Sequence, residues 1–160
     1  MAFDESLAHL LEERRIATLT TYSEDGLPHV TAVWYLYEDG AIYIATDTNT
    51  SKGKNLQRDP RMAICIESRE GGREAGLSAC GVAQLLTGDE AAPIALRLNA
   101  KYLTDEAMAH PVVGAFFIES SNLVIKLEPR RWISWDMAAL GEQVFGCHIE
   151  EAEFFKPLEI

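Results

Sequence analysis

Residues 13–67 read ERRIATLTTYSEDGLPHVTAVWYLYEDGAIYIATDTNTSKGKNLQRDPRMAICIE, and this stretch decides the fold. Three of its runs, at 16–22, 29–37 and 41–46, are rich in β-branched and aromatic residues. Such runs are typical of strands, and a DG pair follows each of the first two, as in a tight hairpin turn. The sequence therefore predicts three antiparallel strands joined by tight turns.

A short helix is expected next, over SKGKNLQRD at 51–59. Thr50 or Ser51 can cap its first turn with a side-chain oxygen, and the helix must end before Pro60 because the residue before a proline disfavours the helical conformation. RMAICIES at 61–68 then reads as a fourth strand.

A fifth strand is expected over LSACGVAQLL at 77–86, after the loop EGGREAG, and Gly81 is expected to mark a bulge. These five strands would form a meander that one short helix interrupts. Closing such a meander into a small barrel, fully or nearly, removes its exposed edges. We expect a mainly β fold, an antiparallel split barrel with short helices, as a single domain over residues 1–160.

The remaining elements are less regular. Asp4 can cap a first helix that buries Leu7, Leu10 and Leu11. Helical composition extends from Asp89 to Tyr102, where Pro93 is tolerable only in the first turn. Two further strands are expected, and two segments have no assignable period; the strands are NLVIKLEP at 122–129 and RRWISWD at 130–136, and the segments are 110–121 and 137–160.

Composition excludes several classes of protein. The net charge of -11 would repel phosphate backbones, so no nucleic-acid partner is expected. No apolar stretch approaches the length of about 20 residues that a membrane-spanning helix needs, and the start has no signal-peptide pattern, so we expect no membrane association and a cytoplasmic location.

Metal and disulfide chemistry are not expected either. Three cysteines without CxxC spacing favour neither a disulfide framework nor a zinc site. Cys147 and His148 lie near three glutamates, but adjacent ligands without a fixed partner spacing seldom bind a metal.

One segment of this acidic chain is basic. Four cations, Lys52, Lys54, Arg58 and Arg61, stand against a single acid, Asp59. Free N–H groups and the positive end of the helix dipole favour a phosphate at the start of helix 51–59, with hydrogen bonds from Thr46, Thr50 or Ser51. An ordinary solvated surface helix with lysines explains this stretch equally well.

The strand PHVTAVWYLY suggests how a flat ring could be held. Main-chain N–H and C=O groups along a strand edge can hydrogen-bond to a heteroaromatic ring, with Ala32 leaving room and Trp34 or Tyr35 packing nearby. Aromatic strands more often serve the core or an interface.

Taken together, these ordered elements resemble the pyridoxamine-phosphate-oxidase-like proteins. That family shows a strand, a DG turn, a PHV strand, a second DG turn, an IYFAT strand, an SRKARNL helix and DPRVAL, and RWISW at 131–135 resembles its closing strand. The resemblance implies a flavin-binding split barrel that works as a homodimer, with FMN bound between the subunits.

By position, the resemblance also implies site residues. Ring contacts fall on the strand from Val30 to Tyr35 and on Ala45 and Thr46; phosphate contacts fall on Ser51 and Lys52, where Ser51 replaces the family's common arginine; and Trp135 takes the place of an aromatic from the partner subunit. The full set of expected cofactor contacts is Val30, Thr31, Ala32, Val33, Trp34, Tyr35, Ala45, Thr46, Thr50, Ser51, Lys52, Lys54, Asn55 and Trp135. Strand alternation gives Trp132 the opposite, packing role.

The function this implies is that of an FMN-dependent oxidoreductase acting on a small aromatic or heteroaromatic substrate. A flavin carries electrons and hydride itself, so the lack of an identifiable catalytic residue is compatible with an enzyme. The alternatives are a reductase that uses the deazaflavin F-420, and a non-catalytic module that binds flavin or haem. Oxidation of pyridoxamine phosphate itself is disfavoured, because the end EEAEFFKPLEI has no counterpart of that enzyme's Arg and His pair.

Overall fold

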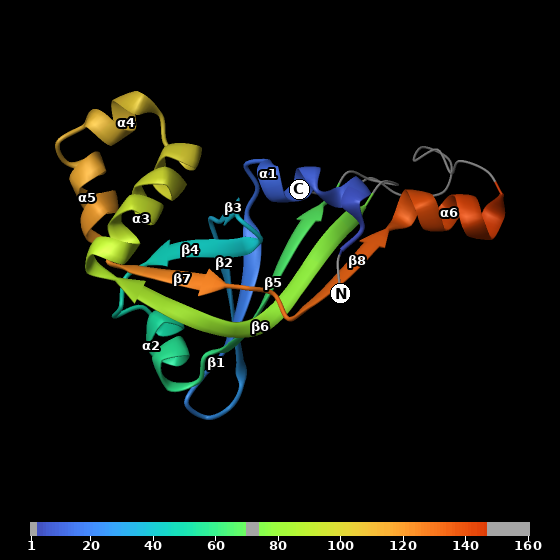
Figure 1. The fold of residues 1–160 in the computed structure, drawn as a ribbon, viewed down its shortest axis with the longest axis horizontal. Helices are drawn as coiled ribbons and strands as arrows, with labels where there is room; N and C mark the ends of the chain where they lie inside the picture. The colour runs from blue at the N-terminus through green and yellow to red at the C-terminus, as the bar shows by residue number, and fades with distance from the viewer. Residues whose placement is uncertain (1–2, 70–73, 147–160) are drawn as a thin grey trace.

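A computed structural model of the protein describes residues 3–69 and 74–146, in which the strands form one curled antiparallel sheet (Figure 1). The sheet runs in the order β2-β1-β5-β6-β7-β4-β3, and β8 pairs with β6. The strands are β1 (Ala17–Tyr22), β2 (Pro28–Val33), β3 (Leu36–Glu38), β4 (Ala41–Thr46), β5 (Arg61–Ser68), β6 (Ala75–Thr87), β7 (Leu123–Leu127) and β8 (Arg131–Asp136).

The run at 29–37, expected as one strand, is two strands. β2 pairs with β1 at one end of the sheet, and β3 pairs with β4 at the other end. The break falls at Trp34 and Tyr35, where the N–H of Tyr35 donates to the hydroxyl of Tyr102 at 3.3 Å instead of to a neighbouring strand. Only Trp34 and Tyr35 separate β2 from β3, so the two edge strands of the sheet meet at these residues and the sheet must curl. We call this meeting point of β2 and β3 the seam.

The expected five-strand meander is also corrected. β4 does not neighbour β5, because β1 lies beside β5 and β4 lies beside β7. The long strand β6 joins the two halves: residues 75–80 pair with β8, and residues 83–87 pair with β7. Gly81 forms no bulge against β5, where its pairing with Met62 continues the regular register, and it lies instead where β6 changes partners.

The core fills the inside of the curl. β1 alternates buried and half-buried residues, as a strand with one face on the core should. The N-terminal segment, a 3-10 turn (Glu5–Leu7) followed by α1 (His9–Glu12), closes the core with the three leucines that the sequence assigned to it. Fully buried side chains at the centre include Leu10, Leu19, Ile44, Ile64 and Leu77.

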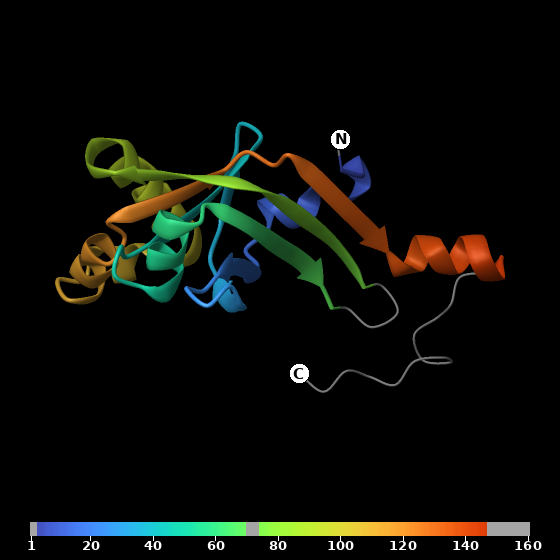
Figure 2. The same cartoon turned by 90° about the horizontal axis from the view of Figure 1, so that it is seen from below.

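Several helices connect the strands of this sheet. The expected short helix is α2 (Ser51–Arg58), capped by Thr50. Between β6 and β7 the chain inserts α3 (Gly88–Tyr102), α4 (Asp105–Ala109) and α5 (Val113–Glu119), which gather at one end of the molecule (Figures 1 and 2). We call residues 88–122 the helical insert. None of the helices in the described part of the chain is long and apolar enough to cross a membrane.

Two expectations about the helices need correction or completion. Pro93 lies in the second turn of α3, because the helix starts at Gly88, so the turn lacks the hydrogen bond that the N–H of a residue at 93 would donate. α5 had no assignable period in the sequence because apolar residues also stand on its solvent side. Phe116 and Ile118 are each 61% exposed. α6 (Met137–Phe145) follows β8 and extends away from the sheet (Figure 2).

Candidate functional site

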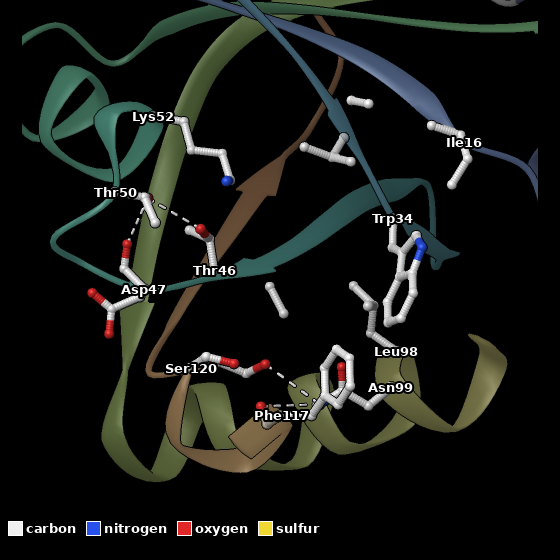
Figure 3. Close-up of a pocket in the computed structure, with 14 residues that line it drawn as sticks. Ile16, Trp34, Thr46, Asp47, Thr50, Lys52, Leu98, Asn99, Phe117 and Ser120 are labelled. Carbon is white, nitrogen blue, oxygen red and sulfur yellow. Dashed lines mark hydrogen bonds between the residues drawn. The ribbon is translucent and has the colours of Figure 1, made fainter. Parts of the chain in front are cut away.

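A hollow of about 470 Å³ lies between α2, the seam of the sheet and the helical insert (Figure 3). Its sheet side is formed by residues of β2, the seam and β4, namely Ala32, Val33, Trp34, Ala45 and Thr46. Its other side is formed by residues of the insert, namely Leu98, Asn99, Phe117, Ser120 and Ser121. Ile16, Asp47, Thr50 and Lys52 complete the lining.

One end of this hollow is the start of α2. The Thr50 hydroxyl oxygen accepts the N–H of Gly53 at 3.2 Å, and the hydroxyl donates to the carbonyl of Asp47 at 2.7 Å. The first intrahelical hydrogen bond runs from the N–H of Lys54 to the carbonyl of Thr50. The N–H groups of Ser51 and Lys52 therefore precede the helical ladder and remain available to an anion.

Lys52 gives this end of the hollow its charge. The side chain is half-buried, and burial lowers the pKa of its ammonium. Among the described residues it makes no ion pair, whereas the nearby Arg61 is paired with Asp59 at 2.6 Å. Lys54 is exposed and outside the hollow. Of the four cations in this basic segment, Lys52 is the one that lines the cavity.

An acid at the same end is held away from this cation. Asp47 accepts hydrogen bonds from the N–H of Asn49 at 2.7 Å and from the amide of Asn122, and both hold its pKa below the ordinary value. In Figure 3 its carboxylate points outward while the Lys52 ammonium points into the hollow. The interior of the hollow therefore carries the positive charge.

Gly53 allows α2 to sit so close to the preceding loop. A Cβ at this position would lie 2.8 Å from the carbonyl oxygen of Asp47 and 3.0 Å from that of Thr48. Both are backbone atoms that cannot swing aside, so a larger residue would push the start of α2 away from the hollow.

The opposite end of the hollow is aromatic. The indole of Trp34 is nearly parallel to the ring of Tyr102, with centroids 4.8 Å apart, and to the ring of Phe117, with centroids 5.5 Å apart. The hydroxyl of Tyr102 donates to the carbonyl of Arg15 at 2.8 Å and accepts the N–H of Tyr35, which fixes the backbone beside Trp34. Stacked, apolar side chains at this end suit a flat ring.

The structure brings half of the expected contact residues to the hollow. Those that line it are Ala32, Val33, Trp34, Ala45, Thr46, Thr50 and Lys52. Those that lie outside its lining are Val30, Thr31, Tyr35, Ser51, Lys54, Asn55 and Trp135. Val30 continues the exposed face of β2 beyond Ala32, at 58% exposure.

Two residues of the second group have packing partners inside the protein. Tyr35 is fully buried, and its hydroxyl donates to the carbonyls of Leu10 and Glu13. Asn55 lies on the buried face of α2, where its amide donates to the hydroxyl of Thr21 at 3.0 Å. Both residues support the elements that carry the hollow.

Trp135 lies in a different part of the molecule. It lines a second hollow of about 260 Å³ beside α6, and it pairs across strands with Gly76. Its ring covers that glycine so closely that a Cβ there would lie 2.0 Å from the indole. Trp132 has the packing role that strand alternation predicts, against Phe3 and the core.

The insert residues of the hollow were missed at the sequence level. Phe117, Ser120 and Ser121 belong to a segment without an assignable period. A signal did exist for Asn99, because it stands one helical turn after Ala95 on the buried face of α3, where a polar residue is unusual.

No group of three His, Cys, Asp or Glu residues that could hold a metal is found within residues 3–69 and 74–146. The cluster around Cys147 and His148 lies outside the described residues. Cys65 and Cys80 are free thiols.

The curled antiparallel sheet with a hollow at its seam is a split barrel, the fold class expected from the sequence. The chain belongs to the pyridoxamine 5'-phosphate oxidase family, whose sequence model matches residues 3–136.

Solved structures agree with this assignment. A conserved hypothetical protein from Mycobacterium tuberculosis is 31% identical, with a TM-score of 0.72 over 88% of this chain and 89% of that one. An F-420 reductase is 23% identical, with a TM-score of 0.64 over 82% of this chain and 98% of that one. A putative pyridoxamine 5'-phosphate oxidase from Listeria innocua is 20% identical, with a TM-score of 0.61 over 81% and 95%. The last two likenesses show the fold alone.

Proposed function

We propose that this protein is an FMN-dependent oxidoreductase that acts on a small aromatic or heteroaromatic substrate. The observation that carries the proposal is the polarity of the hollow. A half-buried ammonium without an ion pair among the described residues lies at one end, at the start of α2, and stacked aromatic rings lie at the other. An anion and a flat ring joined in one ligand match both ends.

The residues present fit FMN. Lys52 and the N–H groups at the start of α2 would hold the phosphate, while Trp34 and Phe117 would contact the ring. Bound FMN would supply the electron and hydride chemistry. This chain would contribute binding, orientation and exclusion of water from the ring.

A homodimer is part of the proposal. Apolar side chains remain exposed on β2 and the turn before it and on β8 and α6, among them Leu27, Val30, Ile133 and Leu140. A second copy that covers such a surface would turn the hollow into a slot with two walls for a flat ring. In that arrangement Trp135 would reach the partner's ring, as the resemblance implies.

The deazaflavin F-420 is the second candidate cofactor, because one structural neighbour is an F-420 reductase and this ligand also joins a phosphate to a flat tricyclic ring. The third candidate, a non-catalytic module that binds flavin or haem, shares the fold but makes no use of a substrate.

One experiment separates these candidates. The absorption spectrum and mass of the cofactor bound to the purified protein would identify FMN, F-420 or haem directly. Bound FMN that bleaches with a reductant and recovers with a definite acceptor supports the oxidoreductase. A protein that binds neither FMN nor F-420 in titrations contradicts the proposal, and a protein that binds flavin without any turnover supports the non-catalytic module.

The dimer and the role of Trp135 have their own test. Trp135→Phe should remove most of the tryptophan quenching that FMN causes, whereas Trp132→Phe should keep that quenching and mainly lower stability. Both changes are made in a Trp34→Phe background, since Trp34 lines the hollow and would also be quenched by a bound flavin. A monomer that binds FMN tightly at dilution, or quenching that survives Trp135→Phe, would show that Trp135 does not face the ring.

A further inference from the structure

The floor of the hollow holds an amide with an unused acceptor. Asn99 on α3 is only 2% exposed. Its Nδ2 donates to the carbonyl oxygen of Phe117 at 3.4 Å and to Oγ of Ser121 at 3.4 Å. Because a carbonyl oxygen can only accept, the Phe117 contact fixes which way the amide is turned. Oδ1 is the atom left over, and no donor among the described residues meets it.

This acceptor is not sealed inside the protein. Among the described residues, no side-chain nitrogen or oxygen that is closed off from solvent lacks a hydrogen-bond partner. Oδ1 of Asn99 is therefore not closed off from solvent. Asn99 and Ser121 line the hollow between α2 and the insert, and they also line a neighbouring hollow of about 520 Å³ within the insert. Figure 3 labels Asn99, together with Phe117, among the residues that line the hollow between α2 and the insert.

A donor stands next to this acceptor. Ser121 is 8% exposed and lines the same hollow. Its Oγ accepts from Asn99, which leaves its own O–H without an acceptor among the described residues. The two neighbouring side chains thus offer one acceptor and one donor to whatever fills the hollow.

We propose that Asn99 and Ser121 together recognise a ring edge on which an N–H stands beside a C=O. Such an imide edge belongs to the pyrimidinedione ring that flavins and deazaflavins share, and a porphyrin has no counterpart of it. This inference rests on the proposed function, and it adds the chemistry by which the insert selects the ring. Lys52 would hold any phosphate, whereas this pair discriminates between rings.

The selection follows from the cost of an unmet acceptor. A ligand that fills the hollow displaces the water that hydrates Oδ1, and a ring without an N–H at this edge then leaves that oxygen unpaired. A site built around a hydrogen bond rejects analogues that lack the matching group more strongly than an apolar pocket rejects a missing methylene.

The test compares FMN with FMN methylated at N3, which removes the imide N–H and leaves the phosphate in place. The unaltered protein should bind FMN about 10- to 100-fold more tightly than the methylated probe. In Asn99→Ala, which removes the amide and leaves room for the methyl group, this ratio should fall close to one. Ser121→Ala should lower it in part, and Gln84→Ala, which removes an exposed amide on β6, should leave it unchanged.

Each outcome has a distinct meaning. Equal binding of the two probes by the unaltered protein, or a ratio that persists in Asn99→Ala, overturns the recognition pair while FMN binding itself still supports the proposed function. Failure to bind FMN or F-420 at all overturns both. The comparison of the two probes needs no substitution, so it decides the matter even if Asn99→Ala does not fold.

Discussion

The two walls of the hollow are built differently. The sheet wall stands on strands whose other faces form the core, where Leu19 and Ile44 are at most 1% exposed. In the insert wall, α4 buries no residue and α5 buries only Gly114, while Phe116 and Ile118 face solvent. α3, by contrast, buries Ala91, Ala95 and Leu98. Few buried apolar contacts mean low local stability, so α4 and α5 should open more readily than the sheet.

This contrast suggests a division of labour between the walls. The sheet wall adjoins the start of α2, where Lys52 and free N–H groups suit a phosphate of any ligand. The insert wall carries Asn99, Phe117 and Ser121, which would meet the part of the ligand that differs between cofactors. Affinity would then depend mostly on the first wall and selectivity on the second.

The largest effect on affinity is expected from Lys52→Ala. Loss of a charged hydrogen bond to phosphate costs about 1.5 to 3 kcal/mol, with the lower end favoured because the side chain is half exposed, so FMN affinity should fall at least about 10-fold. Lys54→Ala is the matched control on the same helix, with an exposed side chain outside the hollow. Fluorescence titration measures both, and the melting temperature without ligand should barely change. Equal losses from the two variants would place the phosphate elsewhere.

Tyr102→Phe tests the hydrogen bonds that connect the insert to the sheet at the seam. Its hydroxyl connects the end of α3 to the backbone at Arg15 and Tyr35, and its loss leaves the N–H of Tyr35 without that partner. The free energy of unfolding in urea should fall by about 1 to 3 kcal/mol. Tyr43→Phe is the control, because the hydroxyl of Tyr43 makes no hydrogen bond with the described residues. An unchanged unfolding midpoint for Tyr102→Phe would show that the seam does not depend on this hydroxyl.

Phe117→Leu should have a smaller effect, on the insert wall alone. It removes the ring that would contact the cofactor, and an aromatic pair contributes about 0.5 to 1.5 kcal/mol, so FMN affinity should fall about 2- to 10-fold. Phe116→Leu changes the neighbouring ring, which is 61% exposed and outside the lining, and should leave affinity unchanged. A greater loss from Phe116→Leu would mean that α5 presents its other face to the ligand.

The smallest effect is a pH dependence carried by Lys52. Burial lowers the pKa of this ammonium below the ordinary value of 10.5, and a bound phosphate favours the protonated form. Affinity for FMN should therefore fall as the pH rises through the pKa of Lys52, and the fall should begin at lower pH than an exposed lysine would cause. Lys52→Arg should keep its affinity over that interval, because a guanidinium stays protonated. Parallel titration curves for the two proteins would show that another group titrates.

Much of the fold could be predicted from the sequence because its signals are local. The DG turns, the cap at Thr50, the end of α2 before Pro60 and the leucines of the first helix depend on residues within a few positions of one another. That Thr46, Thr50 and Lys52 lie together in the hollow was predictable for the same reason, since they surround one strand end and one helix start.

Tertiary structure alone decided the rest. The break at Trp34 depends on a hydroxyl from Tyr102, which is 67 positions from Tyr35 in the chain, and the order of the strands depends on pairings between distant segments. Asn99 and Ser121 meet the sheet only because the insert folds back over the seam. A local sequence pattern determines whether a segment forms a helix, a strand or a turn. Which distant segments line the same cavity depends instead on how the whole sheet buries its apolar face.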